Sequence, residues 1–184
     1  MKRLLDVSSS LLALLLLSPV LLGVALAVFG GDFGPVLFRQ RRVGRGGREF
    51  SMYKFRSMVV NAERLGSYST ADGDPRITRV GRFIRRTSLD ELPQLFNVLL
   101  GDMSLVGPRP DVPAQRGMYT DEEWQARHRV RPGLTGLAQS TLRSEATVEQ
   151  RKQMDLRYAR DASLLLDLQI IAMTFKQVFG KGGN

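Results

Sequence analysis

The 184-residue chain contains no cysteine and a single histidine. Without cysteine, a disulfide scaffold, a thiolate zinc or iron–sulfur site and a cysteine nucleophile are excluded. One histidine excludes metal sites built from several imidazoles, and we predict a structural role for His128. Acidic residues are also few, 18 against 27 Lys and Arg, so the formal net charge is +9. This charge favours an anionic partner, which could be a nucleic acid, a phosphorylated small molecule or an acidic membrane face.

Charge is absent altogether from residues 11–29. A helix of this length extends about 28 Å, close to the ~30 Å hydrocarbon core of a bilayer. A cleavable signal peptide is one interpretation, since Lys2 and Arg3 precede the run and Ala25-Leu26-Ala27 resembles a cleavage site. The run is long for a signal peptide, however, and the residues after it are basic, which suits retention at an anionic cytoplasmic surface.

A single membrane span and a re-entrant helix are the other two interpretations. A single span would place one of two positive flanks outside, against the preference of Lys and Arg for the cytoplasmic side. Pro19 removes a helical donor and clashes with the carbonyl four residues earlier, so it predicts a kink. Ser18 can bond a backbone group freed by the kink. These features favour a re-entrant helix–break–helix over residues 1–30, with an ordinary kinked span as the alternative.

Residues 31–184 are predicted to form one membrane-associated domain on the cytosolic side, of the normal domain size. The fold class is α+β and mostly helical, with a short β-hairpin and helices partly embedded in the membrane interface. For the apolar helix near the C-terminus, core packing is the alternative to embedding. The expected elements are a hairpin over 36–42 and 48–55, helices over 59–65, 77–86, up to Leu100, 121–129, 145–161 and 163–179, and a polar loop over 66–74.

Asp90 and Glu91 form an acidic pair before an apolar helical stripe. Ser88 and Glu91 have the spacing of a capping box, whereas Pro93 is better accommodated as the first residue of a helix. In either case both carboxylates lie at a helix N-terminus, and simple capping is the plain interpretation. Adjacent carboxylates are also hard oxygen ligands that suit Mg²⁺, and the neighbouring Arg85 could bind phosphate oxygens. Together these groups suit phosphoryl transfer.

Further motifs occur in a fixed order along the chain. They are the Ser18-Pro19 break, Lys54-Phe55-Arg56-Ser57-Met58, Arg85 to Pro93, Asn97 to Pro110, Arg131-Pro132-Gly133-Leu134-Thr135-Gly136 with Gln139, and Leu164 to Leu168 before a terminal apolar helix. On these motifs the sequence resembles the monotopic phosphoglycosyl transferases, the bacterial sugar transferases that begin lipid-linked glycan assembly. The resemblance covers nearly the whole chain, and the compact length is similar to that of the small catalytic form.

The resemblance implies transfer of a sugar 1-phosphate from a UDP-sugar to a polyprenol (undecaprenyl) phosphate, with release of UMP. Asp90 is the implied nucleophile of a covalent phosphosugar–aspartyl intermediate, with Mg²⁺ held at Asp90 and Glu91. Arg85 and Arg109 match positions that bind substrate phosphate. The further expected substrate contacts are Lys54, Arg56 and Gln139. The resemblance also supports the re-entrant helix and a location at the cytoplasmic face of the bacterial inner membrane.

One segment departs from the family pattern. After Gln139 many members continue with a Gly-Arg-Asn type of turn, where this chain has Ser140 to Glu145. The donor sugar is therefore not carried over, and the glycan pathway and any association with further copies of the chain are left open. The basic residues after the apolar run are expected to contact anionic lipid rather than form a plain solvated face. They are Arg39, Arg41, Arg42, Arg45 and Arg48.

A membrane-tethered basic module that binds nucleic acid or acidic lipid is the alternative function. Charge alone supports it, since the sequence shows no nucleic-acid-binding motif and its basic residues are spread along the chain. We therefore expect no nucleic-acid partner. A secreted basic protein behind a signal peptide is a third interpretation, which an intact N-terminus in the membrane fraction would eliminate.

Overall fold

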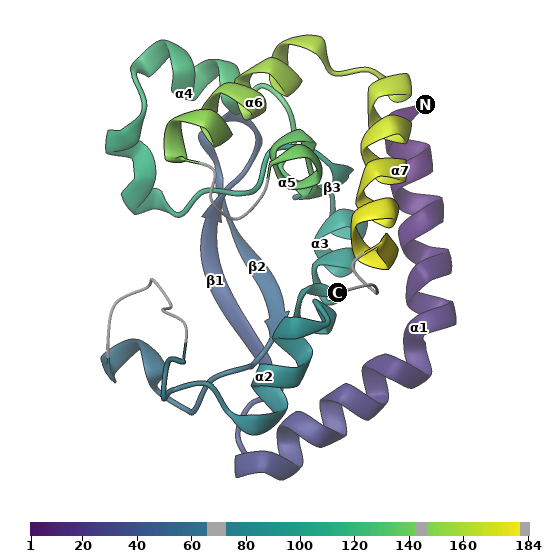
Figure 1. The fold of residues 1–184 in the computed structure, drawn as a ribbon, viewed down its shortest axis with the longest axis vertical. Helices are drawn as coiled ribbons and strands as arrows, with labels where there is room; N and C mark the ends of the chain where they lie inside the picture. The colour runs from purple at the N-terminus through teal and green to yellow at the C-terminus, as the bar shows by residue number, and fades with distance from the viewer. Residues whose placement is uncertain (66–72, 143–146, 181–184) are drawn as a thin grey trace.

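The computed structural model describes residues 1–65, 73–142 and 147–180, and Figure 1 shows their arrangement. The helices are α1 (Lys2–Asp32), α2 (Arg79–Arg86), α3 (Gln94–Leu100), α4 (Asp121–Arg127), α5 (Leu137–Thr141), α6 (Val148–Asp161) and α7 (Leu164–Gly180). The strands are β1 (Leu37–Val43), β2 (Glu49–Phe55), β3 (Ser104–Val106) and β4 (Gly133–Thr135). Short 3-10 helices are η1 (Arg45–Gly47), η2 (Ala62–Leu65), η3 (Leu89–Glu91) and η4 (Pro113–Met118).

The predicted hairpin is confirmed as the antiparallel pair of β1 and β2. Its turn contains Gly46 and Gly47 at φ of 69° and 77°, conformations that L side chains rarely adopt. One face of β2 is buried, because Phe50 and Met52 pack against Val98 of α3. The hairpin therefore packs β2 against α3 and against η3, the turn that contains the acidic pair.

A second, parallel pair joins β3 to β4, with Ser104 opposite Gly133. Sequence analysis did not predict it, since three-residue strands carry no measurable alternation. The two segments approach so closely that a Cβ on Gly133 would lie 2.0 Å from the nitrogen of Gly107. Glycine is required here by lack of space, and the close approach brings the residues after β3 beside β4.

The long apolar helix α1 is bonded to the body at both ends. At its start Lys2 Nζ pairs with Asp167 Oδ2 at 2.6 Å, and Asp6 Oδ1 accepts from Ser104 Oγ at 3.0 Å. At its end Asp32 forms an ion pair with Arg56. Figure 1 shows α1 bending partway along its length. Pro19 lies inside the helix and is the residue type at which sharp bends occur.

Among the described residues, α1 is the helix long and apolar enough to cross a membrane. Its most apolar 18-residue window has a mean hydropathy of 2.7, and only 6% of the window is buried. Such low burial distinguishes α1 from the core helix of a soluble protein. The exposed apolar side chains of α1 include Leu11, Leu12, Leu15, Leu16, Leu22, Leu26 and Phe29.

The C-terminal helix α7 lies beside the first half of α1 in Figure 1 and presents two kinds of surface. Ile170 is fully buried in a core cluster with Val106, Leu137 and Tyr158. Leu165 and Phe175 are more than half exposed. The core-packing interpretation of α7 therefore holds for one face, and the other face is largely exposed.

The remaining element predictions differ from the structure mainly at their ends. The helix expected over 59–65 is limited to the 3-10 helix Ala62–Leu65. The helix ending at Leu100 is confirmed, with Gly101 as a left-handed C-cap at φ of 94°. Thr120 caps α4 in a capping box with Glu123. Of the polar loop predicted over 66–74, residues 66–72 lie outside the described residues.

Candidate active site

The acidic pair lies in a single 3-10 turn between α2 and α3. The predicted capping box at Ser88 is wrong, because Ser88 adopts a left-handed conformation at φ of 57° and its side chain makes no cap bond. Pro93 has helical backbone angles and directly precedes the first residue of α3. This is close to the alternative prediction, in which Pro93 is the first residue of the helix. Without a capping role, the Glu91 side chain is available for partners elsewhere in the fold.

Glu91 binds two cations from distant segments. Its Oε1 accepts from Lys54 Nζ at 2.8 Å and from Arg109 Nη2 at 2.7 Å. Burial by itself would raise the pKa of Glu91, but the charges and hydrogen bonds of Arg109 and Lys54 outweigh it and lower that pKa to about 2. Glu91 is therefore ionised throughout the physiological range and neutralises part of a cationic cluster.

Asp90 is in the opposite situation. It is only 7% exposed, and within the described residues no Lys, Arg or His lies within 4 Å of its carboxylate. Burial raises the pKa of Asp90 above its usual value of 3.8, although the charges of Lys54 and Arg85 partly oppose the shift. A carboxylate that is desolvated and not ion-paired is a better nucleophile than a solvated one, because less hydration must be removed before it attacks.

Arg42 is a site residue that sequence analysis assigned to the lipid-facing basic run. The structure corrects this, because Arg42 turns toward the Arg109 loop and donates from Nη1 to the carbonyl of Pro110 at 2.8 Å. The pKa of Arg42 is lowered to about 10, mainly by burial and secondly by the like charge of Arg109. The alternation of side chains along a strand could have predicted this. Along β1, exposed Arg39 and Arg41 alternate with half-buried Gln40 and Arg42.

Three cations, Arg42, Lys54 and Arg109, thus surround the acidic turn. Burial lowers the pKa of Lys54, but the nearby Glu91 carboxylate opposes this effect. Since Asp90 and Glu91 carry at most two negative charges against these three cations, the cluster retains an excess of positive charge. Such an excess around a desolvated carboxylate suits a substrate with two phosphates.

The other predicted site residues are distributed around this cluster. Arg85 lies in the last turn of α2, and its charge acts on Asp90. Arg56 is directed to the end of α1, where it pairs with Asp32 and donates to the carbonyl of Pro35 at 2.6 Å. The structure therefore occupies Arg56 with an anchoring contact, and its predicted substrate role remains a prediction.

Gln139 lies on α5 next to the close approach of Gly107 and Gly136. A Cβ on Gly136 would lie 2.6 Å from Gln139 Oε1 and 2.2 Å from the Gly107 carbonyl. Both side-chain amide atoms of Gln139 are buried and have no hydrogen-bond partner within the described residues. Of the segment Ser140 to Glu145 that departs from the family pattern, residues 143–145 lie outside the described residues. Ser18 and Pro19 lie in α1, where Ser18 Oγ donates to the carbonyl of Leu15 at 2.8 Å.

The donor set of the acidic turn fits Mg²⁺ only in part. In the described portion of the chain, no three His, Cys, Asp or Glu side chains gather into a metal-binding group. The Asp90 carboxylate forms no ion pair with a described residue, and Glu91 Oε2 is not engaged by the two cations that bind Oε1. Mg²⁺ commonly takes one or two protein carboxylates and completes its shell with water and substrate phosphates. The residues present fit this mode of binding.

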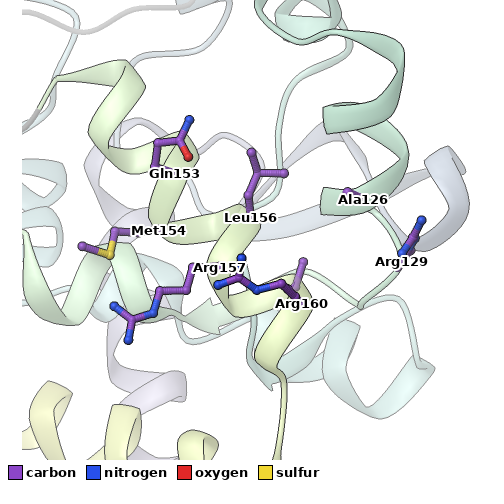
Figure 2. A pocket seen from close by; sticks show the side chains of 8 residues that line it. Ala126, Arg129, Gln153, Met154, Leu156, Arg157 and Arg160 are labelled. Carbon is purple, nitrogen blue, oxygen red and sulfur yellow. The ribbon is translucent and has the colours of Figure 1, made fainter.

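A separate pocket of about 630 Å³ lies between α4 and α6 (Figure 2). Three of its lining residues are the arginines Arg129, Arg157 and Arg160. None of the predicted site residues lines it. The candidate site is accordingly defined by the acidic turn and its cations rather than by this hollow.

Comparisons with known proteins agree with the resemblance. The family model described as "Bacterial sugar transferase" matches residues 1–181. The chain is 48% identical to the undecaprenyl-phosphate glucose phosphotransferase of Komagataeibacter xylinus, over 96% of this chain and 35% of that protein. It is 45% identical to the UDP-glucose:undecaprenyl-phosphate glucose-1-phosphate transferase of Escherichia coli K12, over 95% of this chain and 39% of that protein.

A third relative matches in length as well. The exopolysaccharide production protein PSS of Rhizobium leguminosarum bv. phaseoli is 45% identical, over 99% of this chain and 96% of that protein. The chain spans only 35% and 39% of the first two relatives. No comparison supports a basic nucleic-acid or lipid-binding module. With the family model covering almost every residue, the chain belongs to the bacterial sugar transferase family.

Proposed function

We propose that this protein transfers a sugar 1-phosphate from a UDP-sugar to undecaprenyl phosphate and releases UMP. The observation that carries the proposal is that Asp90 is desolvated and forms no ion pair with a described residue, while the neighbouring Glu91 binds Lys54 and Arg109. Two relatives at 45% and 47% identity are named UDP-glucose:undecaprenyl-phosphate glucose-1-phosphate transferase, and one at 48% is named undecaprenyl-phosphate glucose phosphotransferase. A relative from Aeromonas hydrophila is named for N-acetylgalactosamine, so the donor sugar of this chain is a matter for assay.

In the first step an Asp90 carboxylate oxygen attacks the phosphorus attached to the sugar. The bond from that phosphorus to the bridging oxygen breaks, and its electron pair leaves with UMP. Asp90 is then joined to the sugar phosphate as an acyl phosphate. Lys54 and Arg109 lie at the adjacent carboxylate, where they can bind the oxygens of the two phosphates as charge moves to the leaving group.

In the second step an oxygen of undecaprenyl phosphate attacks the same phosphorus. The bond to Asp90 breaks and regenerates the carboxylate, and the product is a lipid diphosphate sugar. One site serves both displacements, since UMP departs before the lipid phosphate occupies the cationic cluster. Arg85 is the further cation placed to hold a phosphate near Asp90.

Asp90 and Glu91 would hold Mg²⁺ together with substrate oxygens. When bound, the ion neutralises negative charge on the departing phosphate. The test is UMP release in EDTA followed by addition of MgCl₂: we expect loss of turnover in EDTA and its recovery with Mg²⁺. Full turnover in EDTA would contradict the metal assignment.

The acceptor explains the position of the site. Its phosphate lies at headgroup level and its tail lies in lipid, so the cationic cluster must lie close to the membrane surface. We propose that α1 enters the cytoplasmic leaflet of the inner membrane as a re-entrant helix with its break at Ser18-Pro19. The exposed apolar side chains of α1 and α7 support this arrangement.

The decisive experiment omits the acceptor. Full-length protein in detergent is incubated with UDP-glucose, UDP-N-acetylgalactosamine or UDP-galactose, quenched and digested for mass spectrometry. We expect a sugar-phosphate adduct on the peptide containing Asp90, with about one UMP released per active site. Asp90→Asn must abolish the adduct, whereas Asp121→Asn, at a carboxylate whose side chain is 82% exposed, must retain it. Turnover with acceptor but no adduct would reject the covalent mechanism.

A further inference from the structure

The loop that carries Arg109 receives its shape from outside itself. Pro108 and Pro110 have no backbone N–H, so this loop has few donors for hydrogen bonds of its own. Four successive carbonyls of the loop instead accept hydrogen bonds from other segments. These bonds are Gly133 N to Pro108 O at 2.9 Å, Arg127 Nη2 to Arg109 O at 2.7 Å, Arg42 Nη1 to Pro110 O at 2.8 Å, and Val43 N to Asp111 O at 2.9 Å.

Arg109 is exposed, whereas its neighbours in the loop are buried. Gly107, Pro108, Pro110 and Asp111 are all buried, and the Arg109 side chain is 48% exposed where it meets Glu91. The buried part of the loop therefore acts as a rigid base. The direction of the Arg109 guanidinium depends on how firmly the carbonyls on either side are held.

The two side-chain donors to the loop have different surroundings. Arg127 is buried and also binds Asp111 and Asp155, so its removal would take the bound arginine away from two buried carboxylates. Arg42 forms no ion pair with any described residue. Its Nε and Nη2 donate to Gln40 Oε1 at 3.1 and 2.6 Å, which leaves Nη1 directed at Pro110. Arg42 thus contributes a fixed hydrogen bond to the loop without serving a structural ion pair.

We propose that Arg42 is a positioning residue for donor binding, which acts through the Pro110 carbonyl to hold Arg109 toward the phosphates of the UDP-sugar. This inference rests on the proposed function. Without Arg42 the buried Pro110 carbonyl, which directly follows Arg109, loses its side-chain donor, and the loop keeps only its bonds at Pro108, Arg109 and Asp111. Arg109 would then lose its fixed approach to Glu91 and to the substrate.

A double-mutant cycle tests whether Arg42 acts through Arg109. The four proteins are wild type, Arg42→Gln, Arg109→Ala and the double variant, each full length, with kcat and KM measured for UDP-glucose at saturating undecaprenyl phosphate. We expect Arg42→Gln to lower kcat/KM by about tenfold, mainly through KM, as for one charge-assisted hydrogen bond. In the Arg109→Ala background the same substitution should change kcat/KM by less than about twofold.

Arg41→Gln is the matched control. Arg41 adjoins Arg42 on β1 but lies on its exposed face, with a side chain 72% exposed and a 3.9 Å contact to Glu49. We expect wild-type kinetics from it. An equal loss from Arg42→Gln in both backgrounds, or no loss in the wild-type background, would overturn the proposal.

Affinity for UDP, measured by isothermal titration on the same four proteins, gives a readout that needs no turnover. If the wild type binds UDP but releases no UMP from any donor, the proposed function fails while the cycle still decides the role of Arg42. Thermal unfolding reports whether each variant folds. Where Arg42→Gln does not fold, Arg42→Lys replaces it, since lysine keeps the charge but cannot bind Gln40 and Pro110 together.

Discussion

Lys54 Nζ lies 2.8 Å from Glu91 Oε1, although the two residues are 37 positions apart in the sequence. The contact joins the end of β2 to the turn before α3. Because Glu91 is ionised down to a pKa of about 2 in the folded protein, its interactions stabilise the fold above its unfolded pKa. That stabilisation is lost as pH falls from about 4.5 through the folded value near 2.

Glu91→Gln should therefore destabilise the protein by about 2 kcal/mol at neutral pH, through loss of two charge-assisted hydrogen bonds, one of them to a half-exposed arginine. The difference in melting temperature between variant and wild type should shrink below about pH 4.5. Glu49→Gln removes an exposed carboxylate 3.9 Å from Arg41 and should change stability little. A Glu91→Gln difference that stays constant with pH would contradict this account.

Asp90→Asn should have the opposite effect on stability. Burial raises the pKa of Asp90, so the folded protein binds a proton there more tightly than the unfolded chain, and ionisation costs stability above the folded pKa. The neutral amide removes that cost. We expect a melting temperature equal to or above that of the wild type at pH 7.5, together with loss of UMP release. A variant that is both inactive and strongly destabilised would indicate a structural role instead.

His128 should make the fold sensitive to mild acid. Its Nδ1 lies 2.8 Å from the Trp124 carbonyl, which can only accept, so Nδ1 carries the proton in the neutral ring. Burial lowers the pKa of His128 below its usual 6.5. The unfolded chain therefore takes up a proton first, and stability should fall as pH decreases from about 6.5 toward the folded pKa.

Melting temperatures of wild type and His128→Gln between pH 8 and 5 test this expectation. The slope below pH 6.5 should be smaller in the variant, whatever its absolute stability. Because His128 is the only histidine in the chain, no second imidazole contributes to the comparison. Parallel slopes would show that other groups cause the acid sensitivity.

The bend of α1 can be tested by labelling. The chain has no cysteine, so Leu4→Cys and Arg48→Cys provide single sites on the two flanks of the apolar segment. With a re-entrant helix, an impermeant maleimide should label neither site in intact spheroplasts and both after permeabilisation. Replacing Ser18-Pro19 by Ala-Ala should straighten the helix and expose one flank. If both flanks stay cytoplasmic in that variant, the break does not determine the topology.

The parts of the fold that were predictable from sequence are those with a local cause. The hairpin follows from β-rich runs around a glycine turn, the end of α3 from Gly101, and the start of α4 from Thr120. The pairing of Ser104 with Gly133 has no local cause. It depends on two glycine-containing segments meeting at a distance that only the folded chain defines.

The same distinction applies to the site. Asp90 and Glu91 were identifiable as adjacent carboxylates before a helix, but the reason they differ was not. Their contrast arises from Lys54 and Arg109, which reach Glu91, whereas no cation in the described part of the chain forms an ion pair with Asp90. Arg42 was placed with the lipid-facing arginines because a basic run gives no direction to its side chains until the strand and its partners are known.

The attachment of α1 at Lys2 and Asp6 on one side and at Asp32 on the other has a mechanical consequence. In the proposed membrane arrangement, the helix cannot tilt or sink in a bilayer without carrying the acidic turn with it. Bilayers of different thickness should therefore change the height of Asp90 relative to the headgroups, since a helix responds to hydrophobic mismatch by changing its tilt. Under the proposed function, lipid composition thereby becomes a control on how readily a tethered acceptor reaches Asp90.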